Sequence, residues 1–153
     1  MNRVRRIAVT PTVDTVAYTA GDVVGGLMTF AVTPQGFDGE IKSVLVTDAA
    51  NQKEPYTLYV FNEAPTTFAD QAAFMPTAAD LNKLVTTVTV GTADYTTSAS
   101  TIGYALLGGH EDTDMAIPVH SDNGDLYIYA VAGDTPDYTT ASDLVLTVTV
   151  DVF

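Results

Sequence analysis

Histidine is the side chain best suited to general acid–base chemistry near neutral pH, and the chain contains two of them, His110 and His120. Neither lies in a G-x-S-x-G or H-E-x-x-H motif, which would place a nucleophile or a zinc ion beside the imidazole. Both lie in polar stretches, where a histidine is usually a solvated loop residue. The sequence therefore predicts a protein that is not an enzyme and has no catalytic residues.

Acidic segments offer a second kind of chemistry, the binding of calcium through oxygen ligands. Residues 110–114 (HEDTD) and 122–125 (DNGD) are rich in such oxygens and close in sequence. However, neither has the EF-hand spacing with its closing glutamate, and acidic turns are ordinary in a protein this negative. The chain also lacks cysteine, which excludes thiolate nucleophiles and cysteine-ligated metal sites. We predict no metal and no cofactor.

The charge of the chain is strongly negative and unevenly distributed. Nineteen Asp and Glu residues stand against six Lys and Arg residues, which gives a net charge of −13. Arg3, Arg5 and Arg6 supply half of the positive charge, so residues 7–153 carry −16. Such a field repels phosphate backbones and anionic lipid heads. We therefore predict that the protein binds neither nucleic acid directly nor a membrane. The acidity suits a role in partner choice, or else simply solubility or a salty habitat.

The three arginines, Arg3, Arg5 and Arg6, are the candidate partner-binding residues. We predict that residues 1–6 form a basic N-terminal arm, which orders on contact with an acidic or polar groove, and that residues 7–153 form a single domain. The alternative is a solvated terminus, or a terminal strand whose arginines face water. No apolar run follows the arginines, as a signal peptide requires, and no apolar stretch approaches the length of a membrane span.

A period of two dominates the sequence and predicts β-strands. Near the end of the chain, Leu144, Leu146, Val148 and Val150 alternate with a more mixed set, so one face of the strand is aliphatic. Repeated Val-Thr pairs favour sheet over helix because branching at Cβ costs χ1 freedom in a helix. About nine strands are expected, at residues 7–10, 26–32, 41–47, 56–61, 85–90, 102–106, 115–119, 126–131 and 144–153.

One helix and one tight turn are expected between the strands. Thr77 and Asp80 have the spacing of a capping box, which predicts a helix of about two turns with Leu81 and Leu84 facing the core. The pair Asn123–Gly124 before a strong strand is typical of a type I′ hairpin turn. Together the elements predict an all-β fold, a β-sandwich or jelly roll of about nine strands with one short helix on a crossover loop.

Five short segments, spread along nearly the whole chain, carry a family resemblance: residues 10–18 (TPTVDTVAY), 21–26 (GDVVGG), 68–74 (FADQAAF), 79–85 (ADLNKLV) and 141–144 (ASDL). In this order they resemble a family of small structural proteins of tailed bacteriophages. The resemblance implies a non-enzymatic virion protein, above all a capsid decoration (cement) protein that stabilises the head from outside. It also implies the major capsid protein as partner and a homotrimer or homodimer. The N-terminal arginines are not part of the resemblance.

The charge predicts a place on the outer surface of the capsid, because packaged DNA would repel a body of −16 from the interior. The alternative function is an adhesion or carbohydrate-binding module of a virion or cell surface, which would use exposed tyrosines and calcium in the acidic loops. Its candidates are Tyr18, Tyr95, Tyr104 and Tyr138, although a tyrosine at a strand edge more often completes the core.

Overall fold

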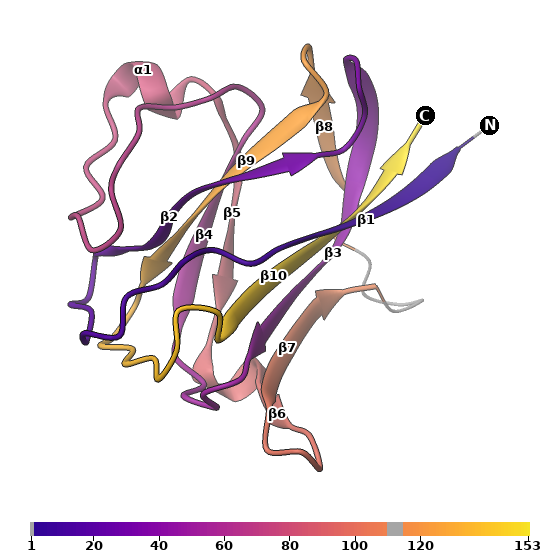
Figure 1. The fold of residues 1–153 in the computed structure, drawn as a ribbon. Helices are drawn as coiled ribbons and strands as arrows, with labels where there is room; N and C mark the ends of the chain where they lie inside the picture. Colours follow the sequence, from indigo (N-terminus) through magenta and orange to yellow (C-terminus); the bar gives the residue numbers. More distant parts are fainter. Residues whose placement is uncertain (1, 110–114) are drawn as a thin grey trace.

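The structure, a computed structural model, describes residues 2–109 and 115–153. The expected all-β class is confirmed, and none of the helices in these two segments is long and apolar enough to cross a membrane. The elements in Figure 1 are β1 (Arg3–Val9), β2 (Val23–Ala31), β3 (Phe37–Asp48), β4 (Tyr56–Phe61), α1 (Ala78–Leu81), β5 (Leu84–Val90), the 3-10 helix η1 (Thr92–Asp94), β6 (Thr96–Thr97), β7 (Gly103–Gly108), β8 (Ile117–Ser121), β9 (Asp125–Ala132) and β10 (Leu144–Val152).

The strands form two antiparallel sheets (Figure 1). The larger sheet has the order β1-β10-β3-β7-β6, with β8 also paired to β3, and the smaller has the order β2-β9-β4-β5. Successive strands alternate between the sheets, except along β4–β5 and β6–β7–β8, and the first strand pairs with the last. This connectivity is that of a jelly roll, so of the two expected architectures the chain adopts the second.

The main hydrophobic core lies between the two sheets and is built from alternate residues of their strands. The aliphatic face predicted for the last strand is confirmed, since Leu144, Leu146, Val148 and Val150 of β10 are all buried. Burial of this continuous aliphatic face is the main reason why the sequence selects two packed sheets.

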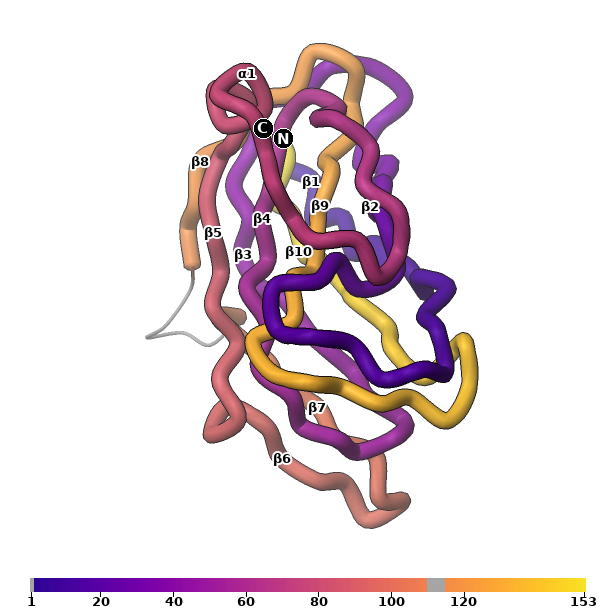
Figure 2. Tube along the Cα trace, turned by 90° about the vertical axis from the view of Figure 1, so that its left-hand side faces the viewer, coloured from indigo at the N-terminus to yellow at the C-terminus, as the bar shows by residue number. Residues whose placement is uncertain are grey.

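A second hydrophobic cluster lies on the outer face of the smaller sheet. Alternate residues of β9 point away from the main core, and among them Tyr129 is fully buried. It is covered by Phe68 and Phe74 from the connection between β4 and β5, residues 62–83. This connection, which carries α1, therefore shields the outside of the smaller sheet from water (Figure 2).

The expected capping box is present, but the helix is shorter than predicted and faces the other way. α1 is a single turn, in which Leu81 remains 45% exposed and Asp80 is buried. The reason is that the Asp80 carboxylate accepts hydrogen bonds from the backbone N–H groups of Thr66 and Thr77. Asp80 thus points inward and fastens both ends of the connection, while Leu84 belongs to β5 and packs on the outer cluster.

The prediction of a hairpin turn at Asn123–Gly124 is wrong. The flanking strands β8 and β9 lie in different sheets, so this segment is a corner at which the chain crosses between layers. Of the two residues, Gly124 alone has a positive φ, 87°, whereas a type I′ turn needs two. The corner is fixed by the buried Ser121 hydroxyl, which donates to the carbonyl of Asp125 and accepts from the N–H of Gly124.

The expected boundary between an arm of residues 1–6 and a domain starting at residue 7 is also corrected. β1 begins at Arg3, and its pairing with β10 places Arg3 opposite Val152, Arg5 opposite Val150 and Arg6 opposite Thr149. The arginines therefore lie on a terminal strand, as in the alternative interpretation. The main-chain ladder with β10 supplies the hydrogen bonds that a free arm would lack.

Candidate functional site

The basic strand β1 is the first candidate site because one of its two edges is open. One side pairs with β10 along the whole strand. On the other side, the described residues form no backbone hydrogen bond with residues 3–9. Every second residue of an edge strand presents its N–H and C=O groups to that free side. β1 thus offers a row of unsatisfied donors and acceptors to an incoming chain.

The arginines lie on both faces of this strand. Arg3 and Arg5 share a face with Ile7 and Val9, which pack against the main core, so the two arginines extend that face beyond the end of the core. Arg6 projects from the opposite face. All three are exposed.

A groove runs beside Arg3 and Arg5. Its other walls are the turn between β2 and β3 and the end of the last strand, and its volume is about 310 Å3. The turn contributes residues 33–36, the last strand contributes Val152, and the residue after it is the 61% exposed Phe153. The groove therefore combines two guanidinium groups with an apolar wall, a composition suited to a carboxylate next to an apolar side chain.

The guanidinium groups have no partners within the part of the chain that the structure describes. Its ion pairs involve Lys42 and His120, whereas the side chains of Arg3, Arg5 and Arg6 form neither an ion pair nor a hydrogen bond there. Three unpaired positive charges on one open strand contrast with the acidic remainder of the chain. Such a strand attracts anionic groups in a partner.

His120 is held between two carboxylates and is not a free base. Its Nδ1 lies 2.8 Å from Asp38 Oδ1 and its Nε2 lies 2.9 Å from Asp122 Oδ1. The pairing of β3 with β8 places Asp38 directly opposite His120. Since both ring nitrogens are occupied, the imidazole has no nitrogen left to accept a proton from a substrate. His110 lies outside the described residues.

The pKa of His120 is expected to lie above its ordinary value of 6.5, because the hydrogen bonds to Asp38 and then to Asp122 favour the protonated ring. The two contacts of the His120 ring with Asp38 and Asp122, called the His120 clasp below, therefore stabilise the fold below pH 6.5, and this contribution is lost as the pH rises through the raised native pKa. NMR titration of the His120 ring measures this pKa. D38N and D122N should each lower it, and a native pKa at or below 6.5 would contradict the clasp.

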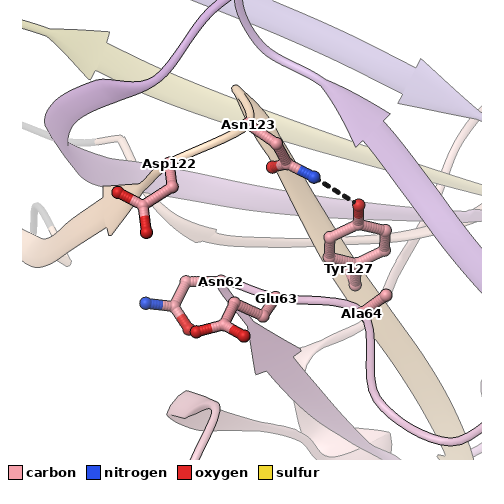
Figure 3. A pocket seen from close by; sticks show the side chains of 6 residues that line it. All are labelled: Asn62, Glu63, Ala64, Asp122, Asn123 and Tyr127. Atoms are coloured by element: carbon pink, nitrogen blue, oxygen red, sulfur yellow. Dashed lines mark hydrogen bonds between the residues drawn. The ribbon is translucent and has the colours of Figure 1, made fainter.

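A second candidate site is an open polar pocket of about 360 Å3 at the corner between β8 and β9 (Figure 3). The start of the connection after β4 supplies Asn62 and Glu63 on one side. Asp122 and Asn123 lie on the other, and Asn123 Nδ2 donates to the Tyr127 hydroxyl at 2.7 Å. The walls are rich in acceptors and carry no positive charge, so the pocket disfavours anions and suits a neutral ligand rich in hydroxyl groups.

The acidic segment 122–125 does not gather its oxygens around one point. Asp122 binds His120, and Asn123 Oδ1 accepts from the N–H of Asp125 within the corner. No group of three or more metal-ligating side chains comes together in residues 2–109 and 115–153. The other candidate segment, residues 110–114, lies outside the described residues.

Three of the four tyrosines considered for sugar stacking belong to the core. Tyr18, Tyr95 and Tyr138 are at most 8% exposed, and Tyr104 alone of the four is exposed, at 38%. Tyr18 also donates its hydroxyl to Asp70 and accepts from the N–H of Asp14, which fixes the loop before β2. The stacking platform expected of a carbohydrate-binding module is therefore not built from these four residues.

The molecule is a jelly-roll protein with an open, basic edge strand. No family model matches the sequence, and no curated protein matches it. Among solved structures it is similar to tomato aspermy virus, with a TM-score of 0.41 and 12% identity over 99% of this chain and 76% of that chain. It is also similar to the nora virus structure, with a TM-score of 0.31 and 9% identity over 99% of this chain and 54% of that chain. A third similar structure is that of mud crab tombus-like virus, with a TM-score of 0.25 and 11% identity over 99% of this chain and 81% of that chain. The chain thus spans about half the length of the nora virus chain. TM-scores this low do not establish a common fold, and no function follows from them.

Proposed function

We propose that the protein is a non-enzymatic virion structural protein, a capsid decoration (cement) protein that binds the outer surface of a phage head. The observation that carries the proposal is the separation of charge: three unpaired arginines lie on one open edge strand, while the rest of the chain carries −16. A compact acidic body with one basic attachment strand suits a protein that binds another protein surface. The resemblance to small phage structural proteins, and the use of jelly rolls in capsids, support the same function.

The acidic body favours the outside of the head. Packaged DNA makes the interior strongly negative, and a body of −16 would be repelled from it, whereas the outer surface imposes no such cost. The proposed partners are the major capsid protein and further copies of this chain. A symmetric shell favours symmetric clusters, so we propose a homotrimer or a homodimer on a local symmetry axis.

A cryo-EM map of virions that contain the protein tests this function. We expect a jelly-roll density on the outer surface of the head, with β1 facing the capsid shell. Mass spectrometry of the purified particles provides the control that the chain is present in stoichiometric amount. Density in the tail or on the inner wall of the capsid would overturn the decoration function, even if the protein proved to be a virion component.

The second candidate function, a carbohydrate-binding module, is favoured by the acceptor-rich pocket of Figure 3. Lectins also use jelly rolls. A glycan array with and without calcium separates the two functions. Saturable glycan binding that is lost in the variant N123A would favour the lectin-like function, whereas attachment to assembled shells without glycan binding favours decoration.

A further inference from the structure

We infer that the open edge of β1 binds an extended acidic segment of the partner protein by strand addition, with carboxylates at alternate positions meeting Arg3 and Arg5 on one face of the strand. The inference rests on the proposed function, because it names the contact through which the protein would attach. Main-chain pairing would supply affinity, and the alternating carboxylates would supply specificity.

The molecule covers a neighbouring edge but leaves this one free. At the start of β2, the connection between β4 and β5 forms its own short ladder: Val23 N–H donates to Ala72 C=O, and Gln71 N–H donates to Val23 C=O. Nothing comparable lies along β1 among the described residues. An uncovered edge of seven residues is long enough for a stable additional strand.

The positions of the arginines match a strand more closely than a flat charged surface. Directly opposite residues of neighbouring strands have their Cβ atoms about 5 Å apart, which brings a carboxylate within reach of a guanidinium group. An incoming strand with acidic residues at alternating positions would place them beside Arg3 and Arg5, on the side of β1 away from β10. Arginine and carboxylate can then form paired hydrogen bonds.

Charged residues on an edge strand can also serve to prevent aggregation. Here the sign of the charge opposes that role. Copies with a net charge of −13 already repel one another, and a positive edge on such a protein attracts acidic chains. Protection against pairing in so acidic a protein would be better served by further acidic residues.

Within residues 2–109 and 115–153, a second copy of this chain does not offer the required strand. The other strands at or along the sheet edges, β2, β5, β6, β7 and β8, contain no Asp or Glu. Acidic residues occur instead in β3, β9 and β10, which have neighbours on both sides. The occupant is therefore an acidic segment of a different protein.

The test uses synthetic peptides of eight residues with both ends blocked, in which Glu alternates with Val or Thr. We expect the peptide to bind the whole protein in isothermal titration calorimetry, to shift the backbone amide NMR signals of β1, and to bind more weakly as salt is raised. The double variant R3Q/R5Q should weaken the affinity about tenfold or more, because these two arginines lie on the face that the glutamates meet. A peptide with Gln in place of Glu should show the same loss.

Two matched controls separate strand addition from general attraction. R5Q and K53Q each remove one positive charge, so they change the long-range field equally, and only R5Q should weaken binding. A peptide that is N-methylated at every backbone nitrogen keeps its carboxylates but loses the donors of both edges, and it should bind poorly. Equal binding of the methylated peptide, or equal loss in R5Q and K53Q, would overturn the inference.

The melting temperature of each variant shows whether its fold is intact, and the exposed arginines should be replaceable without loss. The assay contains no capsid. Absence of peptide binding would therefore remove strand addition as the contact, while the decoration function would still stand or fall on the cryo-EM map. Amide shifts confined to another strand would likewise contradict the inference.

Discussion

Replacing Gly124 with alanine should destabilise the fold by about 3 kcal/mol or more. Gly124 has a φ of 87°, a left-handed conformation that is unfavourable for any residue with a Cβ atom. In addition, a Cβ atom at this position would overlap the carbonyl oxygens of Thr33 and Gln35. The corner cannot move aside easily, because the Gly124 carbonyl accepts hydrogen bonds from the N–H groups of Val32 and Thr33. Urea unfolding measures the loss.

Gly21 provides the matched control for this substitution. Its φ of 94° is close to that of Gly124, but a Cβ atom at Gly21 would meet no atom within 4 Å. Gly21→Ala should therefore cost only the backbone term, about 1–2 kcal/mol. The difference between the two variants isolates the packing of the corner against the turn between β2 and β3. Equal losses would show that this packing contributes nothing.

The corner also shows why part of the fold could not be predicted. The Asn123–Gly124 signal correctly locates a reversal of the chain, but a hairpin further requires that both flanking strands share a sheet. That condition depends on tertiary pairing, here of β8 with β3 and of β9 with β2 and β4. By contrast, the alternating pattern of β10 is sufficient to predict its buried face, because this pattern is local and does not depend on which strand pairs with it.

For α1 and β1 as well, local signals could be predicted from the sequence but tertiary contacts could not. The capping box could be recognised from Thr77 and Asp80, but the direction of the helix depends on the hydrogen bond from Thr66, a residue fourteen positions from Asp80. Basic residues at 3, 5 and 6 interrupt the apolar pattern, so the start of the chain resembles an arm. Its ladder with β10 joins residues at opposite ends of the sequence, and local spacing carries no signal for that pairing.

The sequence predicts which residues belong to the candidate site but not how they are arranged. Counting charges identifies Arg3, Arg5 and Arg6, but their exposure on an open edge follows from the sheet order. The His120 clasp was missed. The spacing of His120 and Asp122 is a weak local hint, whereas Asp38 is brought opposite His120 only by the register of β3 with β8.

Replacing Tyr129 with alanine should cost about 3–5 kcal/mol of the free energy of unfolding, as for other large aromatic side chains in a core. Tyr129 is fully buried, and its ring packs against Phe68 and Phe74 at centroid distances of 5.7 and 5.3 Å. Its hydroxyl donates to the carbonyl of Thr66 at 2.7 Å and accepts from the N–H of Phe68 at 2.8 Å. The side chain thus anchors the connection over the smaller sheet through both its ring and its hydroxyl.

The variant Tyr129→Phe separates the two contributions. It retains the ring but removes the partner of the Thr66 carbonyl and of the Phe68 N–H, two partly exposed hydrogen bonds whose loss should cost about 0.5–1.5 kcal/mol. Denaturant unfolding compares the two variants, and limited proteolysis within residues 62–83 should detect early release of the connection. Equal stability of Tyr129→Phe and the unchanged protein would show that the hydroxyl does not hold the connection in place.

The outcome for Tyr129→Phe also bears on where a partner binds. The outer cluster lies on β9 and its neighbours in the smaller sheet, whereas β1 is at the edge of the larger one. A loosened connection should therefore leave acidic peptides bound to β1 with unchanged affinity. A parallel loss of peptide binding would place the contact surface on the covered sheet, and the open edge of β1 would then be free for another purpose.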